Sequence, residues 1–223
     1  MNVARRLDEL LQTRYLTLGL PTGGFRGGAE RVDSPWSFAA LEGRLVSMLP
    51  GVMSASLSAV FQVIRDAQEE GETVAWVGGV QSGFYPPDAA RWGVDLAAVA
   101  VIRVASDKDM WFAADTLIRS GGVGLVVIDS ASMGDQRVSK GATVLQHRLS
   151  GLARTHGTAV LILPSGSERE TGGALVSLTV QTQMRPLDSP ASIYNVLVTP
   201  QRDKTGASHW KIEELCDAPD GLC

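Results

Sequence analysis

The feature that most constrains the fold is the alternation, from Gly43 onward, of short apolar runs with segments of helical periodicity. The apolar runs have the length of buried strands, and the segments between them repeat apolar residues at helical spacing. This alternation predicts an α/β fold, with a mostly parallel central sheet covered by helices on both faces. We expect strands at 45–49, 73–77, 98–105, 125–128 and 159–163, and helices at 56–69, 87–92, 106–119 and 140–155.

The pattern changes in the last third of the chain. Runs at 176–184, 194–199 and 209–213 look like strands, and no helical segment separates them. Strands that follow one another directly tend to pair as antiparallel neighbours. We therefore expect an antiparallel C-terminal edge on the sheet.

Composition divides the chain into three segments, which are 1–42, 43–215 and 216–223. The first holds a short amphipathic helix at 3–13 and a Gly-rich loop or linker at 14–41. That helix either packs on its own core or docks on a neighbouring protein. The second segment is the predicted α/β core, and the third is predicted to be a disordered tail.

Charge and composition exclude several classes of protein. The net charge of −4 and the pI of about 5.4 argue against a strongly basic nucleic-acid binder. Cys216 and Cys223 have no metal-ligand set beside them, and the three His residues lack ligand spacing. The chain start lacks the apolar region of a signal peptide, and no apolar run reaches the roughly 20 residues of a membrane span. We expect a cytoplasmic protein without membrane contact.

The segment 43–64 reads GRLVSMLPGVMSASLSAVFQVI, which is an apolar strand, a Pro-Gly loop and an apolar helix. This is the frame of a phosphate-binding loop, in which Gly-x-x-x-x-Gly-Lys-Ser/Thr follows a strand. Without a gap, the two glycines become Pro50 and Ala55, the Lys becomes Ser56, and the Ser/Thr becomes Leu57. The Lys would reach the β- and γ-phosphates, and the hydroxyl would hold Mg²⁺. The segment therefore predicts a nucleotide-binding fold that has lost much of its nucleotide chemistry.

Two interpretations of this loop remain open. Backbone N–H groups at the helix N-terminus could form a weak anion site without a Lys, so that ATP with Mg²⁺ binds weakly at most. Alternatively, the loop is a vestigial turn that packs through Val52, Met53 and Leu57. The residues of a degenerate nucleotide loop would be Pro50, Gly51, Ser54, Ser56 and Leu57.

The order of these segments resembles the core of RecA, the bacterial recombinase. The matching stretches are GRLV at 43–46, QVIRDAQEEGETVAWV at 62–77, RWGVDLAAV at 91–99, IRSGGVGLVVIDS at 118–130 and TGGALVSLTV at 171–180. They belong to a region from Gly43 to about Leu215, which is most of the chain. The resemblance implies a RecA-like core whose Walker B strand ends at Asp129.

Several positions depart from the RecA pattern. RecA-family enzymes carry a catalytic Glu after their second core strand, and that position falls on or near Gln81, which can orient a water but cannot act as a base. The residue that senses the γ-phosphate falls near Ser165. Asp129 either holds Mg²⁺ through water or caps the turn that follows it. Both segments that correspond to the DNA-binding loops of RecA are short.

A short RecA-like core without its nucleotide motifs resembles the ImuA family, small accessory proteins of bacterial mutagenesis cassettes. That resemblance implies a non-enzymatic, nucleoid-associated adaptor in SOS-induced, error-prone translesion synthesis and DNA repair. The implied partners are ImuB, a catalytically inactive Y-family polymerase homologue, or RecA, or both. Two alternatives stay open, which are a divergent DNA-stimulated ATPase of the RecA superfamily and a SulA-like inhibitor of cell division.

Two groups of basic residues are candidates for contacts with a partner or with single-stranded DNA. Arg202 and Lys204 lie in an expected turn between the last two strands. Lysines near this place in RecA reach the neighbouring subunit, so the resemblance also implies self-association.

The second basic group lies on or beside the expected helix at 140–155. Its members are Arg137, Lys140 and Arg148, together with His147 and Arg154. Lys140, His147 and Arg154 share one helical face because they are spaced by sevens. This face is either a nucleic-acid stripe or an ordinary solvated surface.

Overall fold

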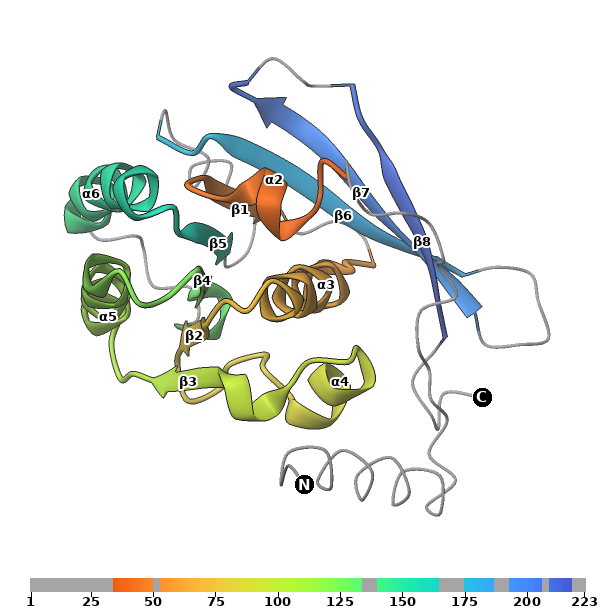
Figure 1. Ribbon diagram of the computed structural model, residues 1–223, viewed down its shortest axis with the longest axis horizontal. Coiled ribbons are helices and arrows are strands. Elements are labelled where there is room, and N and C mark those ends of the chain that lie inside the picture. Colours follow the sequence, from red (N-terminus) through yellow and green to blue (C-terminus); the bar gives the residue numbers. More distant parts are fainter. Residues whose placement is uncertain are drawn as a thin grey trace, which may run out of the picture.

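The computed structural model describes residues 34–49, 53–133, 140–164, 175–186, 193–205 and 209–217. These form an eight-stranded sheet with the order β3-β2-β4-β5-β1-β6-β7-β8 (Figure 1). The strands are β1 (Leu45–Leu49), β2 (Val74–Gly78), β3 (Val99–Arg103), β4 (Leu125–Asp129), β5 (Ala159–Leu163), β6 (Leu178–Pro186), β7 (Ile193–Asp203) and β8 (Ile212–Asp217). The helices are α2 (Phe38–Leu41), α3 (Ser56–Glu69), α4 (Pro86–Arg91), α5 (Asp107–Ser120) and α6 (Lys140–His156), with short 3-10 turns at Leu96–Ala98 and Ser130–Met133.

The sheet is parallel from β3 to β6, and β7 and β8 close one edge in antiparallel orientation. The predicted α/β fold with an antiparallel C-terminal edge is therefore confirmed. One detail differs, because β6 pairs in parallel with β1 before it pairs in antiparallel with β7.

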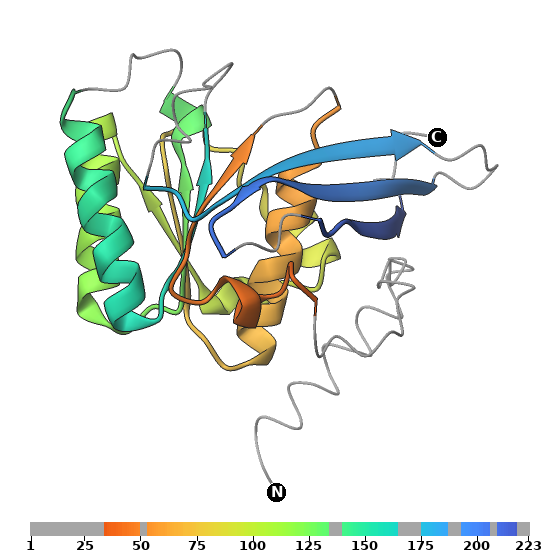
Figure 2. The ribbon, with the colours of Figure 1, turned by 90° about the horizontal axis from the view of Figure 1, so that it is seen from above.

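Helices cover both faces of the parallel strands (Figures 1 and 2). α3 packs on one face with α2 and α4 near it, and α5 and α6 lie side by side on the other. Side chains of β1 alternate between two cores, with Val46 and Met48 in the cluster under α3 and Leu45 in the cluster under α5 and α6. This alternation follows from the two-residue period of a strand. It explains why strands that are buried on both faces read as continuous apolar runs.

The ends of α5 and α6 follow local sequence signals. Ser106 is the N-cap of α5, and its side chain accepts a hydrogen bond from the backbone N–H of Asp109. Gly121 ends α5 with φ 67°, and Gly157 follows α6 with φ 68°. Glycine adopts this left-handed conformation without the penalty of a Cβ.

None of the helices within the described ranges has the length and the apolar character of a membrane span.

The ordered core extends beyond the predicted bounds at both ends. Trp36 is 0% exposed and its Nε1 donates to the backbone oxygen of Ala59 at 3.2 Å, so the expected linker through residue 41 is wrong over its last residues, which form α2. Cys216 is buried in β8 rather than at the start of a disordered tail. A single buried side chain in a short, mostly polar segment gives no apolar pattern, so the sequence does not predict its burial. The expected helix at 3–13 lies outside the described residues.

Candidate functional site

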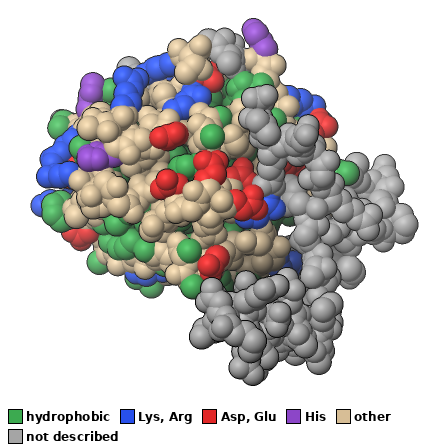
Figure 3. Space-filling view, viewed as in Figure 1, with side chains coloured by type: hydrophobic (Ala, Val, Ile, Leu, Met, Phe, Trp, Pro, Cys, Tyr) green, Lys and Arg blue, Asp and Glu red, His purple; other side chains and the backbone are tan. Residues whose placement is uncertain are grey.

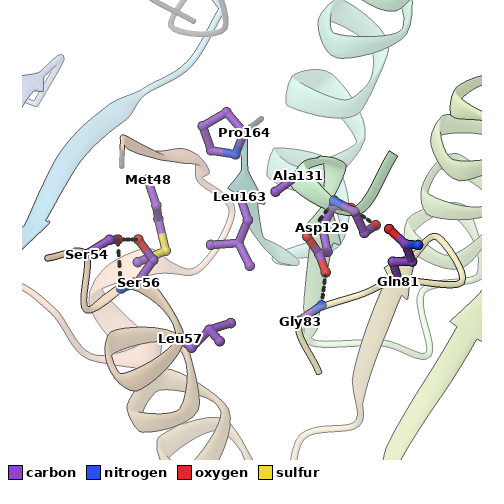
Figure 4. Close-up of a pocket in the computed structure, with 11 residues that line it drawn as sticks. Met48, Ser54, Ser56, Leu57, Gln81, Gly83, Asp129, Ala131, Leu163 and Pro164 are labelled. Carbon is purple, nitrogen blue, oxygen red and sulfur yellow. Dashed lines mark hydrogen bonds between the residues drawn. The ribbon is translucent and has the colours of Figure 1, made fainter. Parts of the chain in front are cut away.

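A hollow of about 320 Å³ lies where the loops after β1, β2, β4 and β5 meet (Figure 4). These strands are parallel, so their carboxyl ends lie at one edge of the sheet. In open parallel sheets, ligands bind at this edge. The sequence-predicted residues that line the hollow are Ser54, Ser56, Leu57, Gln81 and Asp129. Pro50, Gly51 and Ser165 lie outside the described residues.

Three hydroxyl groups meet beside the first turn of α3. Ser54 Oγ lies 2.7 Å from Ser56 Oγ, which in turn lies 2.8 Å from Thr182 Oγ1 on β6. Ala55 is the N-cap of α3 and offers no side-chain hydrogen bond to the helix. The hydroxyls that stand near a phosphate-binding position therefore bond to one another. They carry no charge, so they cannot neutralise a phosphate as a Lys does.

In the ungapped alignment, Leu57 takes the place of the Mg²⁺-binding hydroxyl of a working loop. Its side chain points into the hollow from the first turn of α3, toward the loop that holds Gly83 (Figure 4). A Cβ built on Gly83 would lie 3.5 Å from Leu57 Cδ2 and 3.8 Å from Asp129 Oδ2. An apolar side chain thus reaches toward the space in front of the carboxylate. Leu57 has no oxygen with which to ligate a hard cation.

The carboxylate of Asp129 bonds to the surrounding loops. Oδ2 accepts hydrogen bonds from Ser82 Oγ at 2.7 Å and from the backbone N–H of Gly83 at 2.8 Å. Oδ1 accepts from the backbone N–H of Ser132 at 3.3 Å. Asp129 is 2% exposed, so these bonds compensate the burial of a charge. The bond from Ser132 caps the turn after β4, which is one of the two roles that the sequence left open for Asp129.

Gln81 lines the hollow from the loop after β2 and is exposed. Its amide has no basic oxygen comparable with a carboxylate, so it can position a water but cannot remove a proton from it. None of the described residues that line the hollow is Lys or Arg. Within the described ranges, no group of three or more His, Cys, Asp or Glu side chains could hold a metal ion. The site as described has few of the groups that phosphoryl transfer requires.

The basic candidates that the structure describes, Arg148, Arg202 and Lys204, lie away from this hollow. Arg202 is in β7 rather than in the expected turn, and its Nη2 donates to the backbone oxygen of Val176 at 3.2 Å. Lys204 follows β7, whose end pairs with the start of β6. It therefore lies near the amino ends of the parallel strands, away from the hollow. Arg148 on α6 forms an ion pair with Asp115 on α5, with 2.8 Å between Nε and Oδ1. Arg137 and the side chain of Lys140 lie outside the described residues.

Sequence reasoning missed Ser82, Ser132 and Thr182. Ser132 stands three residues after Asp129, where Asp and Ser often bond to local backbone, so the spacing offered a signal. Ser82 donates to Asp129 across 47 residues, and Thr182 meets Ser56 across 126 residues. Contacts at such separations depend on strand order, which no local motif encodes.

Comparison with known proteins supports a RecA-like assignment at the level of the fold. No family model matches the chain. RecA of Rickettsia canadensis is 26% identical over 136 residues, which are 54% of this chain and 39% of that protein. RecA of Fusobacterium nucleatum is 31% identical over 91 residues, which are 41% of this chain and 24% of that protein. The chain therefore matches well under half the length of these relatives.

A solved structure extends the similarity beyond the segments that align in sequence. The crystal structure of the RadB recombinase matches with a TM-score of 0.58 and 16% identity, covering 80% of this chain and 92% of that one. At this identity the match concerns the fold alone. The chain thus has a RecA-like fold, and about half of its sequence is similar to RecA proteins.

Proposed function

We propose that this protein is a RecA-like accessory protein in bacterial SOS-induced, error-prone translesion DNA synthesis and DNA repair. It acts as an adaptor through protein–protein contacts rather than through nucleotide turnover. Its partner is an ImuB-type polymerase homologue, RecA, or both, and it works in the cytoplasm near the nucleoid. The similarity to RecA proteins supports the general setting of DNA repair.

The observation that carries this proposal is the lining of the hollow at the carboxyl edge. In the ungapped alignment Leu57 replaces the hydroxyl that would hold Mg²⁺, and the carboxylate of Asp129 accepts hydrogen bonds from three loop groups. The described lining offers no Lys or Arg, and a carboxylate repels a phosphate. On this proposal the protein keeps the fold for its binding surfaces and has lost the nucleotide chemistry.

The experiment that tests this proposal is a titration of the purified protein with the ImuB-type homologue and with RecA from the same organism, using interferometry. We expect one of the two to bind at micromolar concentration, with equal affinity in the presence and absence of ATP and Mg²⁺. Failure of both to bind would contradict the adaptor role. Filamentation of cells on overexpression in a host without the mutagenesis cassette would instead favour the SulA-like alternative.

A further inference from the structure

One side of helix α5 carries a row of basic, aromatic and acidic side chains. Lys108, Phe112, Asp115 and Arg119 are spaced by four, three and four residues, so they fall along one side of the helix. Phe112 is 67% exposed, and Lys108 is exposed as well. Asp115 is 2% exposed, and Arg119 forms an ion pair with it.

Helix α6 carries a matching stripe. Val144, Arg148, Gly151 and Thr155 repeat the spacing of four, three and four residues. Val144 is 70% exposed, and a Cβ built on Gly151 would meet no atom within 4 Å. The ion pair between Arg148 and Asp115 joins this stripe to that of α5. We call the surface formed by Lys108, Phe112, Arg119, Val144 and Arg148 the α5–α6 face.

The α5–α6 face is positively charged although the protein as a whole is negative. Asp115 is shared by Arg119 and Arg148, whose side chains remain 52% and 50% exposed. Lys108 adds another positive charge, and the sequence of α6 contains no Asp or Glu. Basic side chains gather on the left of Figure 3, where Figure 1 places α5 and α6. The two guanidinium groups are held in position by a buried carboxylate, which lowers the entropy that they lose on binding.

We propose that the α5–α6 face binds an amphipathic helix of a partner protein, with apolar side chains over Phe112 and Val144 and acidic side chains against the basic residues. Charge complementarity selects the acidic partner. Spaced apolar anchors are the mark of a helix that docks on helices. A single-stranded nucleic acid fits less well, because bases stack on aromatic side chains and Val144 offers no ring. The inference rests on the proposed adaptor role, since it names the surface that such an adaptor would use.

A direct test uses a fluorescein-labelled designed helical peptide with Leu along one side and Glu beside it. Its binding to the full chain is followed by fluorescence anisotropy. A second peptide, with Lys in place of every Glu, and an oligo-dT strand serve as competing probes. We expect saturable binding of the Glu peptide, with affinity that falls as salt rises, and no comparable binding of the other two. Equal binding of the Lys peptide, or tighter binding of oligo-dT, would overturn the proposal.

Matched variants locate the binding on the surface. Lys108→Glu should weaken binding of the Glu peptide about tenfold, and Phe112→Ser should do so by a similar factor. Arg154→Glu makes the same change of charge on α6, but residue 154 lies off the Val144–Thr155 stripe, so affinity should stay within about twofold. All three positions are exposed, and circular dichroism checks that each variant folds. An unchanged affinity in Lys108→Glu, or an equal loss in Arg154→Glu, would refute the assignment.

This test uses no candidate partner of the proposed function. If the Glu peptide binds as expected but neither ImuB nor RecA does, the α5–α6 face stands and the proposed partners fail. If RecA or ImuB binds and Lys108→Glu leaves that binding intact, the adaptor role stands and the α5–α6 face fails as its surface.

Discussion

Asp129 is held at the end of its strand by hydrogen bonds from residues both near and far in the sequence. It ends the strand expected to carry a Walker B acid, yet both of its oxygens accept hydrogen bonds from neighbouring loops. The sequence could offer both roles for this residue but not decide between them. One of its hydrogen-bond partners, Ser82, is 47 residues away and could be found only from the sheet order.

At this scale we predict that Asp129→Ala destabilises the protein by about 3 kcal/mol. The substitution removes the acceptor for hydrogen bonds from Ser82, Gly83 and Ser132, and each donor left unsatisfied costs about 1–3 kcal/mol when it stays dry. Urea denaturation measures the change in the free energy of unfolding. Asp129→Asn keeps an oxygen in place and should lose less. A change within about 0.5 kcal/mol in Asp129→Ala would contradict the structural role.

The elements that the sequence predicts best are those with a strong local signal. The predicted bounds of β1, α3 and β5 match the structure, because each is a clean apolar or amphipathic run. α2 escaped prediction because it has four residues and follows a Gly-rich segment. The direction of β6 could not be predicted either, since it depends on a pairing with β1 across more than a hundred residues.

Two glycines give a matched test of element packing. Gly151 lies inside α6, where an added Cβ would meet no atom within 4 Å, so Gly151→Ala should stabilise the protein by about 0.5–1 kcal/mol. A Cβ on Gly79 would lie 2.8 Å from Met133 Sδ and 2.9 Å from the backbone oxygen of Ser132, so Gly79→Ala should destabilise. Thermal unfolding compares the two. Equal effects of both substitutions would contradict the difference in packing between Gly151 and Gly79.

An ion pair fixes the far end of β7 to the start of the core. Arg44 Nη2 lies 2.5 Å from Asp203 Oδ1, and the carboxylate side chain is 2% exposed. Burial acts to raise the pKa of Asp203, but hydrogen bonds from Thr205 and Arg44 together outweigh it and hold the pKa below its usual range. A lowered pKa means that the folded state favours the ionised form.

The pH dependence that follows has a definite sign. The stability supplied by Asp203 is present above the pKa of an unfolded Asp, about 3.9, and is lost as the pH falls through the lower folded value. Asp203→Asn should therefore be less stable than the wild type at neutral pH, with a gap that narrows as the pH drops below about 4. Urea denaturation at a series of pH values measures this gap. A gap that is constant with pH would show that the charge of Asp203 is not the source.

At the scale of the whole molecule, the strand order separates two surfaces that the sequence could not place. The hollow lies at the carboxyl ends of the parallel strands, and Arg202 and Lys204 lie near the amino ends of these strands. Neither basic residue therefore lines the hollow of its own chain. The α5–α6 face belongs to the layer formed by α5 and α6, which covers one face of the sheet (Figure 1).

A titration with a fluorescent ATP analogue and Mg²⁺ tests whether the protein keeps the fold without its nucleotide chemistry. It is done with and without single-stranded DNA, and phosphate release is measured on the same samples. We predict no saturable binding and no release at micromolar protein, because Leu57 offers Mg²⁺ no oxygen and the described lining of the hollow offers phosphate no Lys or Arg. Saturable binding with DNA-stimulated release that disappears in Asp129→Asn would contradict the claim and establish a divergent ATPase.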